Sequence, residues 1–149
     1  MSGSMARRSV LHAGAALCVF ALAPRARACE FFSSNLRVFH PWTRASPPGS
    51  DSATVSMIFD QVTRADRLIA AETPVAEGAE MGGVGARANV VDFAIAQGRE
   101  SALAETGTYL RLVRLTQPLE IGRAYPLKLV FESGDVVAAT LNIDYMRFR

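Results

Sequence analysis

Residues 125–145, with the sequence YPLKLVFESGDVVAATLNIDY, decide the fold class of this chain. Two runs of apolar and β-branched residues stand on either side of a short polar turn, Ser133-Gly134. A glycine-containing turn between two such runs is typical of a β-hairpin. In the first run apolar side chains recur at every second position, at Leu127, Leu129 and Phe131. Since alternate side chains of a strand point to the same face, the stretch predicts an antiparallel hairpin with one buried face.

The chain upstream of this hairpin has the same character. Residues 109–115, YLRLVRL, alternate apolar and charged positions over part of their length, as a half-buried strand does. Proline- and glycine-rich stretches at 46–50 and 78–85 predict loops. No internal segment has helical periodicity, so the sequence predicts an all-β fold, a Greek-key β-sandwich or barrel. Shorter apolar and β-branched runs predict further strands at 36–39, 53–59, 67–71 and 89–96.

The first 28 residues differ from the rest and follow the plan of a secretory signal peptide. Arg7-Arg8 supplies a basic start, 10–23 is uncharged and mostly apolar, and 26–28 (Ala-Arg-Ala) is a small-x-small cleavage site. The apolar run is shorter than the roughly 20 residues that a membrane-spanning helix needs, and no second such run follows. We therefore expect export and cleavage after residue 28, by the general secretory route or, given the paired arginines, by the twin-arginine route.

Cleavage at this point divides the chain into a leader (1–28), a flexible lead-in (29–35) and one β-domain (36–149). Cys29 then becomes the first residue of the mature protein. A lipid-attachment signal would place a bulky aliphatic residue three positions before this cysteine and a small residue two before it, where the chain has alanine and arginine. The sequence therefore predicts a soluble periplasmic protein without a lipid anchor at Cys29.

Composition excludes several classes of function. The whole chain carries a formal charge of +2, but removal of the leader with its four arginines leaves 12 basic and 14 acidic residues. The basic character belongs to the leader, so nucleic-acid binding has no support. Residues 29–149 contain one cysteine, one histidine (His40) and one lysine (Lys128), which rules out an internal disulfide and removes most catalytic arrangements. We expect a protein that is not an enzyme.

Three segments in a fixed order resemble one known family. Residues 40–49, HPWTRASPPG, contain the pattern Trp-x-Arg-x-x-Pro-Pro-Gly, and residues 67–76, RLIAAETPVA, form a strand-like run. Residues 117–131 begin with Gln-Pro-Leu and continue with spaced Gly, Pro-Leu, Leu and Phe. Together these segments resemble the PCu(A)C family of periplasmic copper chaperones, over residues 36–144. The resemblance implies a cupredoxin-like β-barrel, copper(I) as the bound metal, and a copper acceptor or another periplasmic protein as partner.

The family's copper ligands are a His or Met, a Met, and a His-x-Met pair, all soft groups that suit Cu(I). Carried over to this chain, the His-x-Met pair falls on Tyr109 and Arg111. The middle Met falls on Phe93, and the first ligand falls on Met81. Met81 alone keeps a suitable donor, because phenol is a poor ligand for Cu(I) and a guanidinium keeps its charge. The resemblance thus predicts the family's fold with a degenerate copper site and no copper bound at the family position.

Two soft groups elsewhere offer an alternative metal site. After cleavage Cys29 would carry both a thiol and the new α-amine, and His40 follows eleven residues later. The alternative interpretation is an exposed thiol at Cys29 and a strand-end imidazole at His40 that packs beside its neighbours. The glycine-rich run at 82–85 lacks the Gly-Lys-Ser/Thr ending of a phosphate loop, so it predicts no phosphate site.

Two hypotheses for function remain. In the first, the protein binds or delivers copper in the periplasm, as the family resemblance implies, although its copper site is degenerate. In the second, the same fold is a metal-free protein-interaction module that presents Tyr109 and Arg111 on the face where the family holds copper. The hypotheses differ in whether the protein has enough soft ligands to bind Cu(I).

Overall fold

The computed structural model describes residues 29–144, and the predicted leader lies outside them. This part of the chain is all-β. None of its residues belongs to a helix with the length and apolar character that a membrane crossing would require. The ten strands are β1 (Glu30–Phe32), β2 (Arg37–Thr43), β3 (Ser52–Asp60), β4 (Asp66–Glu72), β5 (Ala76–Gly83), β6 (Phe93–Ile95), β7 (Ser101–Leu103), β8 (Thr108–Leu115), β9 (Ala124–Phe131) and β10 (Val136–Ile143).

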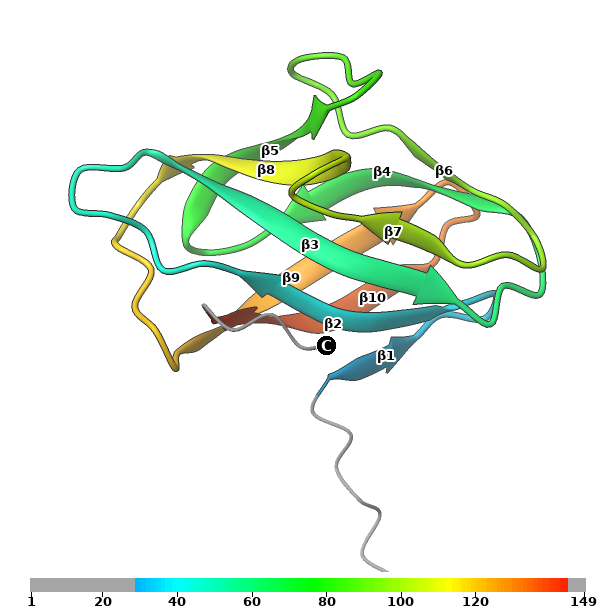
Figure 1. Cartoon of the computed structure of the whole chain (residues 1–149). Coiled ribbons are helices and arrows are strands. Elements are labelled where there is room, and N and C mark those ends of the chain that lie inside the picture. The colour runs from blue at the N-terminus through cyan, green and yellow to red at the C-terminus, as the bar shows by residue number, and fades with distance from the viewer. Residues whose placement is uncertain (1–28, 145–149) are drawn as a thin grey trace, which may run out of the picture.

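The strands form one sheet in the order β5-β8-β3-β2-β10-β9-β4-β6, with β1 added beside β2 and β7 beside β3. The pairings are antiparallel except for that of β10 with β2, which is parallel. The sheet curls around one core until β4 and β5 contact each other, so the barrel is nearly closed (Figure 1). The predicted all-β barrel is therefore confirmed.

Alternate apolar residues of the strands fill the barrel. In β9 the side chains of Leu127, Leu129 and Phe131 are buried, as the alternation in the sequence predicted. The ring of Phe131 meets that of Phe59 from β3 edge to face, with the ring centroids 6.2 Å apart. Full burial of a leucine or phenylalanine side chain contributes about 1.5–3 kcal/mol. Packing of this kind is the main source of stability for a domain that contains one cysteine and so has no internal disulfide.

The C-terminal hairpin forms at the predicted turn. The amide of Gly134 donates to the carbonyl of Phe131 (3.0 Å), and the amide of Phe131 donates to the carbonyl of Asp135 (2.9 Å). Gly134 has a φ of 96°, which residues with a Cβ rarely adopt, so the turn requires glycine at this position. β10 ends at Ile143, and the last residue of the predicted strand, Tyr145, lies outside the described residues.

Residues 29–35 differ from the predicted flexible lead-in because they contain β1. This short strand pairs with residues 37–39 of β2, and its Phe31 packs against the core. Nη1 of Arg37 donates a hydrogen bond to Oε1 of Glu30 (2.9 Å), which ties the two strands together. These contacts come from elsewhere in the fold, so the local sequence of 29–35 gave no signal for a strand.

The glycine-rich segment 78–85 also differs from the predicted loop. Residues 78–83 belong to β5 and pair with β8 along their whole length. The strand predicted at 89–96 is shorter in the structure, where β6 spans Phe93–Ile95. Glycine lowers strand propensity, but here the neighbouring strand supplies the hydrogen bonds and needs the space that the missing side chains leave.

Candidate functional site

The antiparallel pair β5–β8 carries three of the four positions at which the resemblance places copper ligands or their replacements. In its register Glu80 lies opposite Arg111, Met81 opposite Leu110, and Gly82 opposite Tyr109. Met81 is 2% exposed and Leu110 is fully buried, so both point into the core. Because side chains alternate along a strand, Tyr109 and Arg111 lie on the opposite, outer face. The structure therefore separates Met81 from the Tyr109–Arg111 pair by the thickness of the sheet.

Arg111 forms an ion pair across the two strands. Its Nη2 lies 2.9 Å and its Nε 3.0 Å from Oε1 of Glu80. The second carboxylate oxygen of Glu80, Oε2, accepts a hydrogen bond from the backbone amide of Asn89 (2.7 Å). The Glu80 side chain is 13% exposed and that of Arg111 39%. Both carboxylate oxygens of Glu80 are thus engaged, and the guanidinium lies along the sheet with its charge neutralised.

Tyr109 lies against the backbone of two glycines. A Cβ placed on Gly82 would overlap the ring of Tyr109, and a Cβ on Gly83 would overlap the carbonyl oxygen of Gly107. Gly83 also has a φ of 83°, in the region that favours glycine. From the sequence, 82–85 is part of a predicted loop and is not a phosphate loop. The pairing with Tyr109 could not be seen there, because the two segments are far apart in the sequence.

Phe93, at the position of the family's middle Met, has only packing contacts. Its ring lies 5.8 Å from that of Phe59, between centroids, and it packs on the edge of the core. It stands in β6, opposite Leu68 of β4. Of the predicted positions the structure brings Tyr109 and Arg111 together, with Glu80 as an added partner, while Met81 and Phe93 belong to the packed interior and its margin.

The alternative pair, Cys29 and His40, is brought together by β1. The register of β1 with β2 begins with Glu30 opposite Phe39, and just before it the amide of His40 donates to the carbonyl of Cys29 (2.6 Å). His40 has a φ of 48° and starts a bulge at which the pairing of β2 with β3 shifts. Burial lowers the pKa of His40 below its ordinary value, and the charge of nearby Asp144 opposes part of that shift. A lowered pKa favours the neutral imidazole, which is the form that binds metals.

Within residues 29–144 no three side chains of His, Cys, Asp or Glu are grouped closely enough to hold a metal ion. A metal site at Cys29 and His40 would therefore have these two side chains as ligands, and any third ligand would come from another group of the protein, from a partner molecule or from solvent. Two ligands of this kind suit Cu(I), which is soft, better than harder cations that prefer oxygen.

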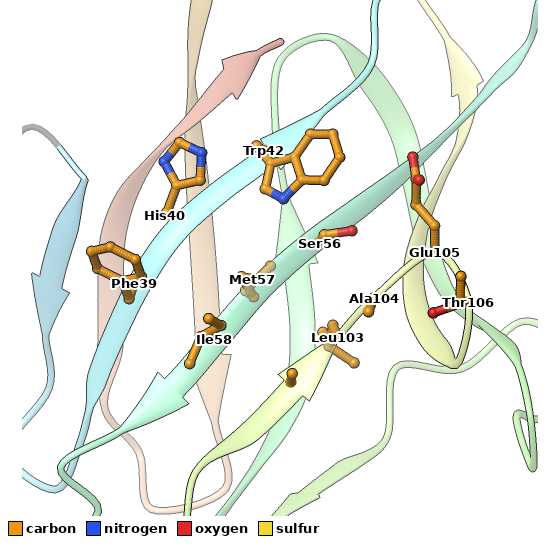
Figure 2. A pocket seen from close by; sticks show the side chains of 11 residues that line it. Phe39, His40, Trp42, Ser56, Met57, Ile58, Leu103, Ala104, Glu105 and Thr106 are labelled. Atoms are coloured by element: carbon orange, nitrogen blue, oxygen red, sulfur yellow. The ribbon is translucent and has the colours of Figure 1, made fainter. Parts of the chain in front are cut away.

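A pocket that sequence reasoning did not foresee lies on the outer face where β2, β3 and β7 meet (Figure 2). It has a volume of about 390 Å³. Its walls come from residues 39, 40 and 42, from 56–58 and from 102–106. These segments are distant in the sequence, and the strand register aligns them. His40 and Trp42 therefore belong to a concave surface as well as to the sequence motif at 40–49.

Comparison of the sequence with models of known protein families finds a match. A family model described as "LpqE-like: Putative lipoprotein LpqE-like" matches residues 36–143. A search of curated proteins finds no match. The match covers the whole barrel from the residue before β2 to the end of β10, which is the part of the chain that carries the motifs described above.

Several solved structures have the same fold. The apo PCuAC domain from PmoF1 is 26% identical, with a TM-score of 0.71 over 78% of this chain and 99% of that domain. The copper-bound PCuAC domain from PmoF2 is 21% identical, also with a TM-score of 0.71, over 78% of this chain and 98% of that domain. The Cu(I) form of DR1885 from Deinococcus radiodurans is 20% identical, with a TM-score of 0.60 over 70% of this chain and 74% of that one.

Proposed function

The chain belongs to the LpqE-like family, which shares the fold of the PCuAC domains, and from this premise we propose that it is an exported periplasmic protein that binds another protein and holds no copper at the family's ligand positions. The family and fold are of the copper-chaperone type rather than those of a known enzyme. The observation that carries the proposal is the ion pair between Arg111 and Glu80 at the place of the family's His-x-Met pair.

The donor set at these positions does not fit Cu(I). Thioether sulfur, thiolate and imidazole bind this ion well, whereas the positions here hold a phenol, a phenyl ring and a guanidinium paired with a carboxylate. Met81 has a suitable sulfur, but its side chain is buried on the other face of the β5–β8 pair from Tyr109 and Arg111. A copper ion beside Tyr109 and Arg111 would meet a phenol and a guanidinium–carboxylate ion pair, and neither of these is a soft donor.

The same face has features of a protein-binding surface. Tyrosine and arginine are enriched among residues that contribute most to protein–protein affinity. The ring of Tyr109 lies on Gly82. Two hydrogen bonds hold the adjoining loop in place. The amide of Met81 donates to the carbonyl of Val90 (2.8 Å), and Oγ1 of Thr108 donates to the carbonyl of Val84 (2.9 Å). Val84 is 76% exposed and Val90 42%. A fixed tyrosine beside exposed valines loses little conformational entropy when a partner covers it.

Competitive Cu(I) titration of the mature domain, residues 29–149, tests the proposal. We expect no saturable binding in the sub-micromolar range from the family position, and no difference between the wild type and Met81→Leu. Sub-micromolar binding that is lost in Met81→Leu would overturn the proposal, because it would place copper at the family's first ligand.

A second candidate function is copper binding or delivery through Cys29 and His40. The backbone hydrogen bond from His40 to Cys29 (2.6 Å) favours it, since it keeps the two residues side by side. In this case the mature domain binds Cu(I), and Cys29→Ser and His40→Ala each weaken binding while Met81→Leu does not. Equal binding by all four proteins would exclude the pair as ligands.

A further inference from the structure

The pocket on the β2–β3–β7 face is shaped by the different sizes of the side chains that line it. In the register Phe39 pairs with Ile58, and Ile58 pairs with Ala102, so these three form one row across the strands. The next row contains Trp42 opposite Ser56. Large side chains stand at the β2 edge and small ones at the β7 edge, and Figure 2 shows the hollow between them. Its volume of about 390 Å³ falls in the range of small ligand pockets.

One end of this hollow already holds a cation. The guanidinium of Arg44, just after β2, lies over the ring of Trp42, with Cζ 5.8 Å from the centroid. It also makes two hydrogen bonds to Glu105, from Nε to Oε1 (2.6 Å) and from Nη2 to Oε2 (3.1 Å). Trp42 and Glu105 both line the pocket. An aromatic face and a carboxylate in this arrangement recognise a planar cation through its charge and its paired donors.

Arg44 lies at the solvent edge of this position. Its side chain is 45% exposed and that of Glu105 27%, so water and salt screen part of the attraction between the two charges. Arg44 does not line the apolar part of the pocket, whose floor at Ile58, Ala102 and Ala104 is open. A guanidinium from another molecule could replace that of Arg44 and also place an apolar group on this floor.

We propose that this pocket binds an arginine side chain of a partner protein, with the guanidinium between Trp42 and Glu105 and an adjacent apolar side chain over Ile58 and Ala102. Arg44 then acts as an internal competitor that occupies the cation position when no partner is bound. The inference names the partner chemistry for the protein-binding role proposed above and rests on that role, although it uses none of residues 80, 109 and 111.

The test uses the fluorescence of Trp42, which is the single tryptophan of the chain. The mature domain is titrated with acetyl-phenylalanyl-arginine amide and with the same peptide carrying citrulline, which is isosteric with arginine but neutral. We expect saturable change with the arginine peptide and at least tenfold weaker binding of the citrulline peptide. Equal binding of the two peptides would overturn the proposal. So would binding of benzamidinium without binding of the arginine peptide, since the pocket would then take a small cation and not a protein side chain.

Variants at the cation position sharpen the test. Glu105→Gln should weaken binding of the arginine peptide at least fivefold, and Arg44→Ala should strengthen it at least threefold, because the competitor is gone. The exposed pair Arg123–Glu120, with Nε 3.1 Å from Oε2, supplies matched controls. Arg123→Ala and Glu120→Gln should leave binding unchanged. Weaker binding in Arg44→Ala would overturn the internal-competitor role. Failure of all peptide binding, with no copper bound in the titration described above, would remove this inference and leave the copper-free family position standing.

Discussion

On the outer face of β5 and β8, the absence of a side chain at Gly82 leaves room for the ring of Tyr109. The tyrosine ring occupies the space that a side chain at position 82 would need. Arg111, two residues further along the same face of β8, pairs with Glu80. The packing of the Tyr109 ring in this place thus depends on the absence of a side chain at Gly82.

Gly82→Ala should lower the free energy of unfolding by about 1–3 kcal/mol, because the new methyl overlaps the Tyr109 ring in a packed site. In a Tyr109→Ala background the same change should be neutral or stabilising, since alanine costs less backbone entropy than glycine. Urea denaturation of the four proteins measures the coupling. Gly107→Ala is the control, because nothing lies near its added Cβ. Equal cost of Gly82→Ala in both backgrounds would show that the ring is not the cause.

A double change, Tyr109→His with Arg111→Met, should create a soft ligand pair on the outer face, since residues two apart in a strand point the same way. We expect Cu(I) affinity to rise at least tenfold, or about 1.4 kcal/mol. The gain rests on two ligands, because Met81 lies on the other face. Competitive Cu(I) titration measures it.

The matched control for that change is Tyr109→Phe with Arg111→Leu, which removes the same phenol and cation but adds no donor. It should leave Cu(I) affinity at the wild-type level. If the wild type already binds as tightly as the His/Met protein, the copper ligands lie elsewhere, and Cys29 and His40 are the first to test.

The side chain of Arg37 on β2 connects three neighbouring strands, β1, β2 and β3. Its Nε donates to Oδ1 of Asp60 (2.7 Å), the residue opposite it on β3, and its Nη1 reaches Glu30 on β1. The hydrogen bond and charge of Arg37 hold the pKa of Asp60 below its ordinary value, against a smaller opposing effect of burial. One side chain thus links three strands that only the folded barrel brings together.

The lowered pKa of Asp60 makes the barrel sensitive to acid. Because the folded-state pKa of Asp60 lies below that of the unfolded chain, the stabilisation is complete at neutral pH, begins to fall below about pH 4 and is lost as the pH passes the lowered folded-state pKa. Asp60→Asn should cost about 1–3 kcal/mol at pH 7 and less at pH 3. Denaturation at the two pH values measures the difference. A cost that does not change with pH would mean that the charge of Asp60 is not what stabilises the three strands.

The barrel as a whole presents two separate outer surfaces, one on β5–β8 around Tyr109 and one on β2–β3–β7 around Trp42. They are built on the one curled sheet, so its strand order positions both. Figure 1 shows β1 at the start of the described chain. β1 begins at Glu30, and the predicted cleavage point is after residue 28. A cut after residue 28 would leave β1 and every contact described here intact.

Export of the whole protein is therefore expected to yield a chain that begins at Cys29. N-terminal sequencing of protein recovered from the cell envelope measures this directly. An unmodified cysteine at the first position would agree with the absence of a lipid-attachment signal. A full-length chain confined to the cytoplasm would contradict the export prediction, and a start well inside β1 would contradict the predicted cleavage point.

The sequence by itself determined the class of fold. Period-two alternation at 109–115 and 125–131 specified which side chains are buried, and a glycine turn at 133–134 specified the hairpin. Motif order was enough to indicate the family, because the three segments at 40–49, 67–76 and 117–131 follow one another as they do in that family. All of these signals are local, and each can be read from neighbouring residues.

Only the tertiary structure decided the surroundings of the candidate sites. Alternation says which face a residue takes but not which strand lies beside it, and register is set by the fit of the whole barrel. Strand pairing placed Glu80 opposite Arg111 and directed the side chain of Met81 into the core. It also placed Cys29 beside His40, and Trp42 in the same pocket as the residues that follow β7. These partners are separated by 11 to more than 60 residues, so their contacts exist only once the sheet has closed around its core.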